Sequence, residues 1–140
     1  MTVVIDASLL AEMLVGSPLG RVAEARLVAE GDLNLPDIAG PQTASVARGW
    51  LRGGRVTAMR AGQMIEDLAI LPARVWPTIP LLGRAWELRD NATIYDAVYV
   101  ALAERLGAKL LTGDGRLGRG LVGRANCEIV CLAAGSETGG

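Results

Sequence analysis

The chain has 140 residues, 51% of them hydrophobic, and a net charge of −1. This length and composition predict one globular domain with its own core, and they exclude a disordered chain and a polycation. The absence of His, with only two Cys, excludes the usual zinc site and catalysis by Ser-His-Asp or Cys-His groups. No apolar run is long enough to cross a membrane, and no basic region precedes a hydrophobic one at the N-terminus, so we expect a cytoplasmic protein.

In the first half of the chain, short apolar runs alternate with helical patterns. Thr2-Val-Val-Ile is a β-branched run that predicts a buried strand, and Ser17 followed by Pro18 is typical of a helix start. Gly53-Gly54 closes a later helix, and Thr57 is a candidate cap for the next one. The expected elements are a strand at 2–5, helices at 9–15 and 19–30, a strand at 32–36, helices from 39 or 41 to 51 and from 57 to 71, and an extended segment at 73–77.

The second half continues the alternation of helices and strands. Apolar residues at helical spacing follow Thr93, and Gly107 stands where a helix C-cap is expected. The expected elements are helices at 81–88 and from 93 to 107, a strand at 109–112, a glycine- and arginine-rich loop at 116–124, a strand at 127–132 and a disordered tail at 134–140. Such alternation predicts a single domain over residues 1–133, a three-layer α/β/α sandwich with a central parallel sheet.

Three aspartates follow strands or begin helices in this pattern. Asp6 ends the first strand, Asp114 ends the strand at 109–112, and Asp96 lies in the first turn of the preceding helix. Each has a simple local explanation, namely an N-cap, a turn and a capping box respectively. Together they have another, because a parallel sheet brings the ends of its strands to one edge, where ligands bind. Grouped carboxylates repel one another, and a hard divalent cation such as Mg²⁺ or Mn²⁺ removes that conflict and supports phosphodiester cleavage.

Three segments of the chain, in order and at the right spacing, resemble the PIN-domain ribonucleases, above all the toxins of VapBC toxin–antitoxin pairs. They are Val3-Val-Ile-Asp6-Ala-Ser8, Tyr95-Asp96-Ala-Val-Tyr-Val-Ala-Leu-Ala-Glu104 and Leu110-Leu-Thr-Gly-Asp114-Gly-Arg-Leu117. The resemblance implies a PIN-like fold and endonucleolytic cleavage of RNA by a cluster that binds Mg²⁺ or Mn²⁺. It assigns Asp6, Asp96 and Asp114 to that cluster as catalytic metal ligands and Ser8 as the accompanying hydroxyl. It also implies a homodimer and an antitoxin that wraps the toxin and blocks its site.

The fourth acid of the family is missing here. The frame Pro36-Asp-Ile-Ala-Gly-Pro-Gln42-Thr-Ala-Ser-Val-Ala-Arg48 matches the family's second acidic segment, but Gln42 stands where the resemblance implies a catalytic glutamate. The amide is nearly isosteric with that carboxylate and carries no charge, so we expect weaker metal binding and reduced cleavage. Glu12 and Asp37 are nearby acids that could partly substitute.

Thirteen of the 14 basic residues are arginine, a side chain that binds phosphates bidentately. Arg116, beyond Asp114, and Arg48, on the helix of Gln42, are candidates for binding RNA phosphates, although a solvated face is the better explanation for any single arginine. The three tryptophans are expected in the core or at a dimer surface, and the two cysteines on one buried strand face.

Two other functions remain open. A non-catalytic PIN-fold module could bind RNA or an antitoxin without cutting, and Gln42 is the residue that discriminates it from an enzyme. A Rossmann-like small-ligand protein is disfavoured because no glycine-rich phosphate loop follows the first strand.

Overall fold

The computed structural model describes residues 2–135 and has the alternating order expected from the sequence. Its elements are β1 (Thr2–Ile5), α1 (Ala7–Val15), α2 (Pro18–Glu30), β2 (Asp32–Pro36), α3 (Ala39–Arg52), α4 (Ala58–Ile70), β3 (Arg74–Trp76), the 3₁₀ turn η1 (Ile79–Leu81), α5 (Leu82–Glu87), α6 (Ile94–Leu106), β4 (Lys109–Thr112), α7 (Gly115–Gly120) and β5 (Ile129–Cys131). The tail expected at 134–140 lies outside the described residues from 136 onward.

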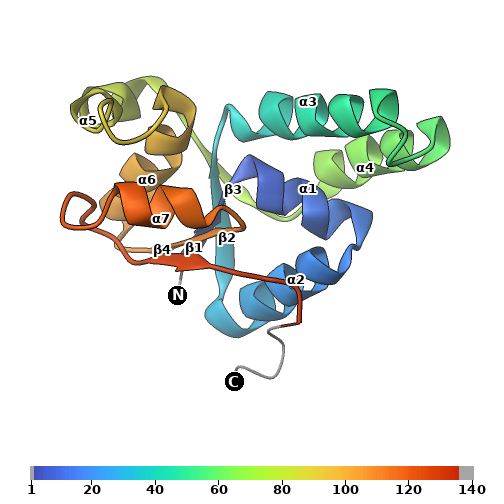
Figure 1. Cartoon of the computed structure of the whole chain (residues 1–140), viewed down its shortest axis with the longest axis horizontal. Coiled ribbons are helices and arrows are strands. Elements are labelled where there is room, and N and C mark those ends of the chain that lie inside the picture. The colour runs from blue at the N-terminus through green and yellow to red at the C-terminus, as the bar shows by residue number, and fades with distance from the viewer. Residues whose placement is uncertain (1, 136–140) are drawn as a thin grey trace.

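The five strands form one parallel sheet in the order β3-β2-β1-β4-β5. From β1 the chain moves outward to β2 and β3, then returns across the sheet to β4 and β5. Right-handed crossovers in these two directions place their helices on opposite faces of the sheet. Figure 1 shows α1 to α4 on one side of the strands and α5, α6 and α7 on the other. The predicted three-layer α/β/α sandwich is therefore confirmed.

The reversal of direction falls between β1 and β4, and the two strands are held there in fixed register. Ile5 pairs with Leu111, and the backbone N–H of Asp6 donates to the Leu111 carbonyl over 3.2 Å. In open α/β sheets, ligands bind outside the carboxyl ends of the strands at such a switch point. The fold thus brings the residues that follow β1 and β4 to the edge where a site is expected.

The core is built around the central strands and α6. Val3 to Ile5 of β1 and Leu110 and Leu111 of β4 are fully buried. In α6, every residue from Ala97 to Ala103 is buried, since this helix lies against the sheet and also packs on α5. Burial on nearly all sides fixes the start of α6, and with it Asp96, relative to β1 and β4.

No helix within residues 2–135 combines the length and the apolar content needed to cross a membrane.

Two expectations for the C-terminal part were wrong. The loop predicted at 116–124 contains α7, because the Asp114 side chain caps this helix by accepting from the Arg116 N–H, and Leu117 and Leu121 anchor the segment by their burial. The two cysteines do not share a buried face, since Cys127 precedes the short edge strand β5 and Cys131 is exposed.

The tryptophans do not fill the core either. Trp50 and Trp76 are half-buried, and 60% of Trp86 is exposed. Each ring lies under an arginine, at 3.8 Å for Arg55 on Trp50, and a guanidinium over the ring face lets an aromatic side chain stay at the surface.

Candidate active site

The three predicted aspartates approach one another at the switch point, each from a different element. Asp6 directly follows β1 and caps α1, Asp114 follows β4 and caps α7, and Asp96 lies in the first turn of α6. Local capping explains the backbone at Asp6 and Asp114, whereas the sheet order explains why the two residues are neighbours.

Asp6 is held on both of its carboxylate oxygens. Its exposed fraction is 6%, its Oδ1 accepts from the Leu9 N–H over 3.0 Å, and its Oδ2 accepts from the Thr112 hydroxyl. The Thr112 oxygen in turn accepts from the Asp114 N–H over 3.0 Å. Thr112 therefore ties the end of β4 to the end of β1 and orients the Asp6 carboxylate. The sequence analysis did not single out this residue, although the polar side chain that ends the apolar run of β4 was a usable signal.

The electrostatics of the aspartates show the conflict expected of grouped carboxylates. Burial raises the pKa of Asp6, hydrogen bonds from Thr112 and Leu9 partly offset that rise, and the charges of Asp96 and Asp114 add to it. Burial likewise raises the pKa of Asp96, with a further rise from the charge of Asp114. A divalent cation would stabilise the ionised form of each group, because it offers opposite charge to carboxylates that now face like charge.

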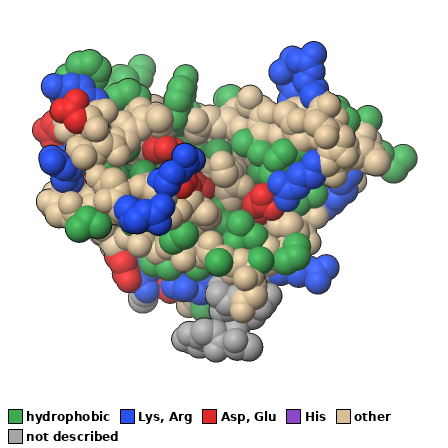
Figure 2. Space-filling model, in the orientation of Figure 1, with side chains coloured by type: hydrophobic (Ala, Val, Ile, Leu, Met, Phe, Trp, Pro, Cys, Tyr) green, Lys and Arg blue, Asp and Glu red, His purple; other side chains and the backbone are tan. Residues whose placement is uncertain are grey.

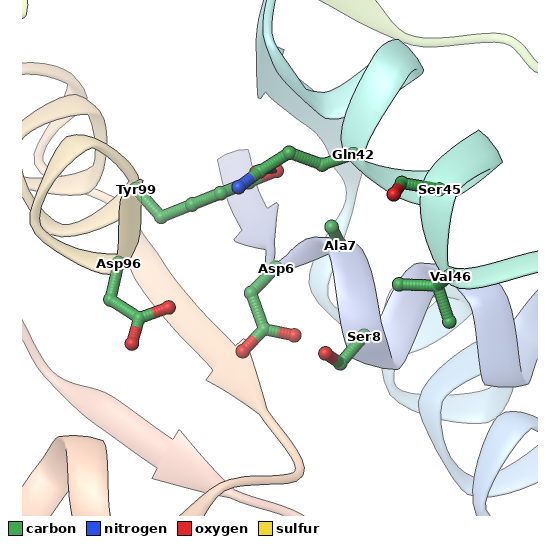
Figure 3. Close-up of a pocket in the computed structure, with 8 residues that line it drawn as sticks. All are labelled: Asp6, Ala7, Ser8, Gln42, Ser45, Val46, Asp96 and Tyr99. Atoms are coloured by element: carbon green, nitrogen blue, oxygen red, sulfur yellow. Dashed lines mark hydrogen bonds between the residues drawn. The ribbon is translucent and has the colours of Figure 1, made fainter. Parts of the chain in front are cut away.

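Asp6 and Asp96 line one pocket of about 290 Å³ (Figure 3). Helices from both faces of the sheet form its walls, with α6 on one side and α1 and α3 on the other. The lining residues are Asp6, Ala7, Ser8, Gln42, Ser45, Val46, Asp96 and Tyr99.

Asp114 lies beside this pocket rather than in its lining. Its Oδ1 accepts from the Arg116 N–H over 2.9 Å and forms an ion pair with Arg116 Nε at 3.4 Å. Within residues 2–135, no three acidic or cysteine side chains are placed to hold one metal ion together. The structure thus brings two of the three aspartates into a shared pocket, and the third has its carboxylate turned to an arginine.

Gln42 reaches the pocket from α3 and meets Tyr99 of α6. The Tyr99 hydroxyl donates to Gln42 Oε1 over 2.7 Å. Burial and the negative charges of Asp6 and Asp96 raise the pKa of Tyr99. The phenol therefore keeps its proton and remains a donor at neutral pH. Tyr99 was also not singled out from the sequence, where an aromatic residue in an apolar helix is typical of core packing.

The three residues predicted to contact RNA differ in their position relative to the pocket. Ser8 is exposed and lines the pocket. Arg116 is 85% exposed beside Asp114, and Arg48 is exposed on α3 outside the pocket lining. Figure 2 shows Lys and Arg side chains directly beside acidic ones on the face over α7. Basic groups therefore border the acidic site on the side of Arg116.

Comparison with known proteins identifies the fold family of this site. The family model for the PIN domain matches residues 3–120. This chain belongs to the PIN-domain family. Ribonuclease VapC12 of Mycobacterium tuberculosis is 32% identical over 128 residues, a match that covers 91% of this chain and 98% of the relative.

Two solved structures of VapBC and VapC proteins share the fold of this chain. The crystal structure of VapBC2 from Rickettsia felis, bound to a DNA fragment from its promoter, covers 95% of this chain and 100% of its own with a TM-score of 0.67 at 10% identity. The Mycobacterium tuberculosis toxin VapC20, which cleaves the sarcin-ricin loop, covers 84% of this chain and 93% of its own with a TM-score of 0.61 at 19% identity. The arrangement of elements is thus conserved where sequence identity is low.

Two further acids of the PIN domain are engaged elsewhere. Glu12 forms a bidentate pair with Arg55 at 2.6 and 3.1 Å and accepts from the Ser17 hydroxyl, and its pKa is lowered because these bonds outweigh its partial burial. Asp37 accepts from the N–H and the hydroxyl of Thr78. Neither lines the pocket. The structure thus offers no support for either as a replacement for the missing acid at position 42.

Proposed function

We propose that this chain is an endoribonuclease toxin of the VapC type, which cleaves RNA phosphodiesters at the pocket of Asp6 and Asp96. The observation that carries the proposal is the pair of buried or half-buried carboxylates with raised pKa values at the switch point between β1 and β4. Perturbed carboxylates in a cleft mark functional sites more often than structural ones. Relatives that share the whole length of the domain are named ribonucleases, which supports the same reaction class here.

We further propose that Asp6 and Asp96 hold a Mg²⁺ or Mn²⁺ ion, with Asp114 as the third acid. The donor set fits such an ion, since carboxylate and hydroxyl oxygens are the ligands of hard cations, and the chain has no His to favour zinc. When bound, the ion would supply charge stabilisation and an activated water for phosphodiester hydrolysis. Asp6 would act from a fixed orientation, because Leu9 and Thr112 hold both of its oxygens.

Binding of the RNA and of protein partners forms the second part of the proposal. Ser8 at the pocket, with Arg116 and Arg48 farther out, would contact phosphates of a single strand laid across the site. By likeness to VapBC pairs, we propose an antitoxin partner and a homodimer in the cytoplasm. The apolar side chains exposed on α4, namely Met59, Ile65 and Ile70, are a surface suited to a partner helix.

A second candidate function is a non-catalytic PIN module that binds RNA or an antitoxin. Two observations favour it. Gln42 replaces an expected acid, and the described residues do not contain a preassembled group of three metal-binding side chains. The enzyme and the module differ in whether two or three aspartates suffice to hold the ion.

The test measures Mn²⁺ affinity and RNA cleavage for the parent chain, Gln42→Glu and Asp96→Asn. We expect Gln42→Glu to bind Mn²⁺ more tightly and cleave faster, because it adds a carboxylate at the pocket, and Asp96→Asn to lose both. Equal cleavage by the parent and Gln42→Glu, with Asp96 still required, would show that the fourth acid is dispensable. Absence of cleavage in both chains would refute the nuclease and leave the binding module.

A further inference from the structure

A hydrogen bond between Tyr99 and Gln42 joins the two walls of the pocket. Tyr99, with an exposed fraction of 1%, projects from α6, and Gln42 projects from α3 on the other face of the sheet. The Tyr99 hydroxyl and Gln42 Oε1 are 2.7 Å apart. Figure 3 shows the two side chains reaching toward each other from opposite walls of the pocket, above the carboxylates of Asp6 and Asp96.

This bond determines which end of the amide is available to a ligand. The tyrosine proton engages Oε1, and Nε2 has no protein hydrogen-bond partner within residues 2–135. The opposite orientation would present the negative Oε1 to the pocket that Asp6 and Asp96 also line, and would leave the tyrosine proton without its acceptor. Both the hydrogen bond and the charges of the pocket therefore favour an amide that presents its two N–H groups.

We propose that Tyr99 is a positioning residue for Gln42, and that the amide it orients donates a hydrogen bond to a phosphate oxygen of the RNA. The inference rests on the proposed function and deepens it, since it assigns the position of the missing acid a role in binding substrate. Gln42 would then be a substrate-binding residue in its own right, in addition to weakening the hold on the metal ion.

Phosphate is the group that this amide suits best. Without a bound cation, a fourth carboxylate at position 42 would repel an RNA phosphate, whereas a neutral amide donor stabilises its oxygens without adding charge. Ser8 and Ser45 line the same pocket, so their hydroxyls offer further neutral donors around the place where the phosphate would lie. The amide of Gln42 and these two hydroxyls would together bind a phosphate next to the aspartates, whereas carboxylates alone would repel it.

The test measures RNA binding without any cleavage. A fluorescent pool of random single-stranded RNA is titrated in EDTA with the parent, Tyr99→Phe, Gln42→Ala and the double variant, and binding is followed by anisotropy. We expect each single variant to raise the Kd about fivefold, the usual effect of one neutral hydrogen bond. The double variant should bind no more weakly than Gln42→Ala, because Tyr99 acts through the amide.

Two controls separate positioning from a structural defect. Tyr95→Phe removes the hydroxyl of an exposed tyrosine on the same helix and should leave the Kd unchanged. Tyr99→Phe should keep the parent's Mn²⁺ affinity, and its melting temperature should fall only by the contribution of one neutral hydrogen bond, because the ring remains in the core. A merely structural Tyr99 would instead lower the melting temperature further and weaken RNA binding equally in both backgrounds.

The inference is overturned if Tyr99→Phe has no effect on the Kd, if its effect is the same with and without Gln42, or if the parent does not bind RNA. Its failure is distinct from failure of the proposed function. If cleavage depends on Asp96 but the effects of Tyr99→Phe and Gln42→Ala on RNA binding are independent, only the proposed role of Tyr99 and Gln42 is refuted. Coupled binding without cleavage in Mn²⁺ would keep that role and refute the nuclease.

Discussion

Replacement of Asp6 by asparagine removes the charge of this side chain and keeps part of its hydrogen bonding. The asparagine Oδ1 can accept from the Leu9 N–H as the carboxylate does, and its amide nitrogen can donate to the Thr112 oxygen, but the Thr112 proton then loses the acceptor that Asp6 Oδ2 provides. What the substitution removes is a buried negative charge that faces Asp96 and Asp114. In EDTA at neutral pH, we therefore expect removal of the like charge to offset the loss of about 1–2 kcal/mol at Thr112, so that Asp6→Asn is close to the parent in stability.

The matched control is Asp6→Ala, whose cost follows from the contacts of the carboxylate. Loss of the α1 N-cap costs about 1 kcal/mol, and loss of the acceptor for the fully buried Thr112 hydroxyl costs about 1–2 kcal/mol. Before the gain from removing the charge, the sum, roughly 2–3 kcal/mol, corresponds to a melting temperature lower by about 8 °C for a domain of this size. Both variants remove the charge and the Thr112 acceptor, so Asp6→Asn should exceed Asp6→Ala in stability by about 1 kcal/mol, the contribution of the cap that only asparagine keeps.

The pH dependence has a defined sign. The folded pKa of Asp6 lies above its ordinary value of 3.8, so the folded chain retains a proton that the unfolded chain has already released. The stability that this proton contributes is complete below 3.8 and is lost as the pH rises through the folded pKa. The stability of Asp6→Asn relative to the parent in EDTA should therefore rise with pH and then become constant.

Urea and thermal unfolding of the three chains, from about pH 4 to 7 in EDTA and then in Mn²⁺, make the test. An ion at 100 times its Kd should stabilise the parent by about 2.7 kcal/mol and leave Asp6→Asn unchanged. If the stability of Asp6→Asn relative to the parent did not rise with pH in EDTA, the charge on Asp6 would not be destabilising. The argument for a cation at this site would then lose its electrostatic basis.

Two further predictions concern the packing that supports the site. In Gly20→Ala, the new Cβ would lie 1.9 Å from the backbone oxygen of Glu12. Urea unfolding should therefore show a free energy of unfolding lower by roughly 3 kcal/mol. The control, Gly62→Ala in the open middle of α4, should instead raise the free energy of unfolding by about 1 kcal/mol. Glu104→Gln should cost about 1–2 kcal/mol at neutral pH, because Arg84 and the Asn126 N–H donate to Glu104. Burial opposes the ionisation of Glu104, but these bonds outweigh it and lower the pKa, so this cost should shrink below about pH 4.5. A difference independent of pH would exclude the charge of Glu104 as its source.

Much of the fold was predictable because local patterns determine it. The β-branched run of β1, the caps at Ser17 and Thr57, and Gly107 in the left-handed conformation at the end of α6 all appear in the structure as the sequence indicates. Alternating strands and helices imply a parallel sheet, and a parallel sheet gathers the ends of its strands at one edge. The sequence alone therefore placed Asp6 and Asp114 at one edge of the sheet, whereas the strand order of the structure makes β1 and β4 neighbours.

Only the tertiary structure decided how the side chains at that edge are engaged. The bond between Tyr99 and Gln42 spans 57 positions, and that between Thr112 and Asp6 spans 106, so no local pattern could reveal either pair. The same holds for Glu12, which is drawn to Arg55 from 43 positions away. Propensity and periodicity act over one turn or one strand, whereas the orientation of a carboxylate depends on the donors that folding brings to it from distant segments.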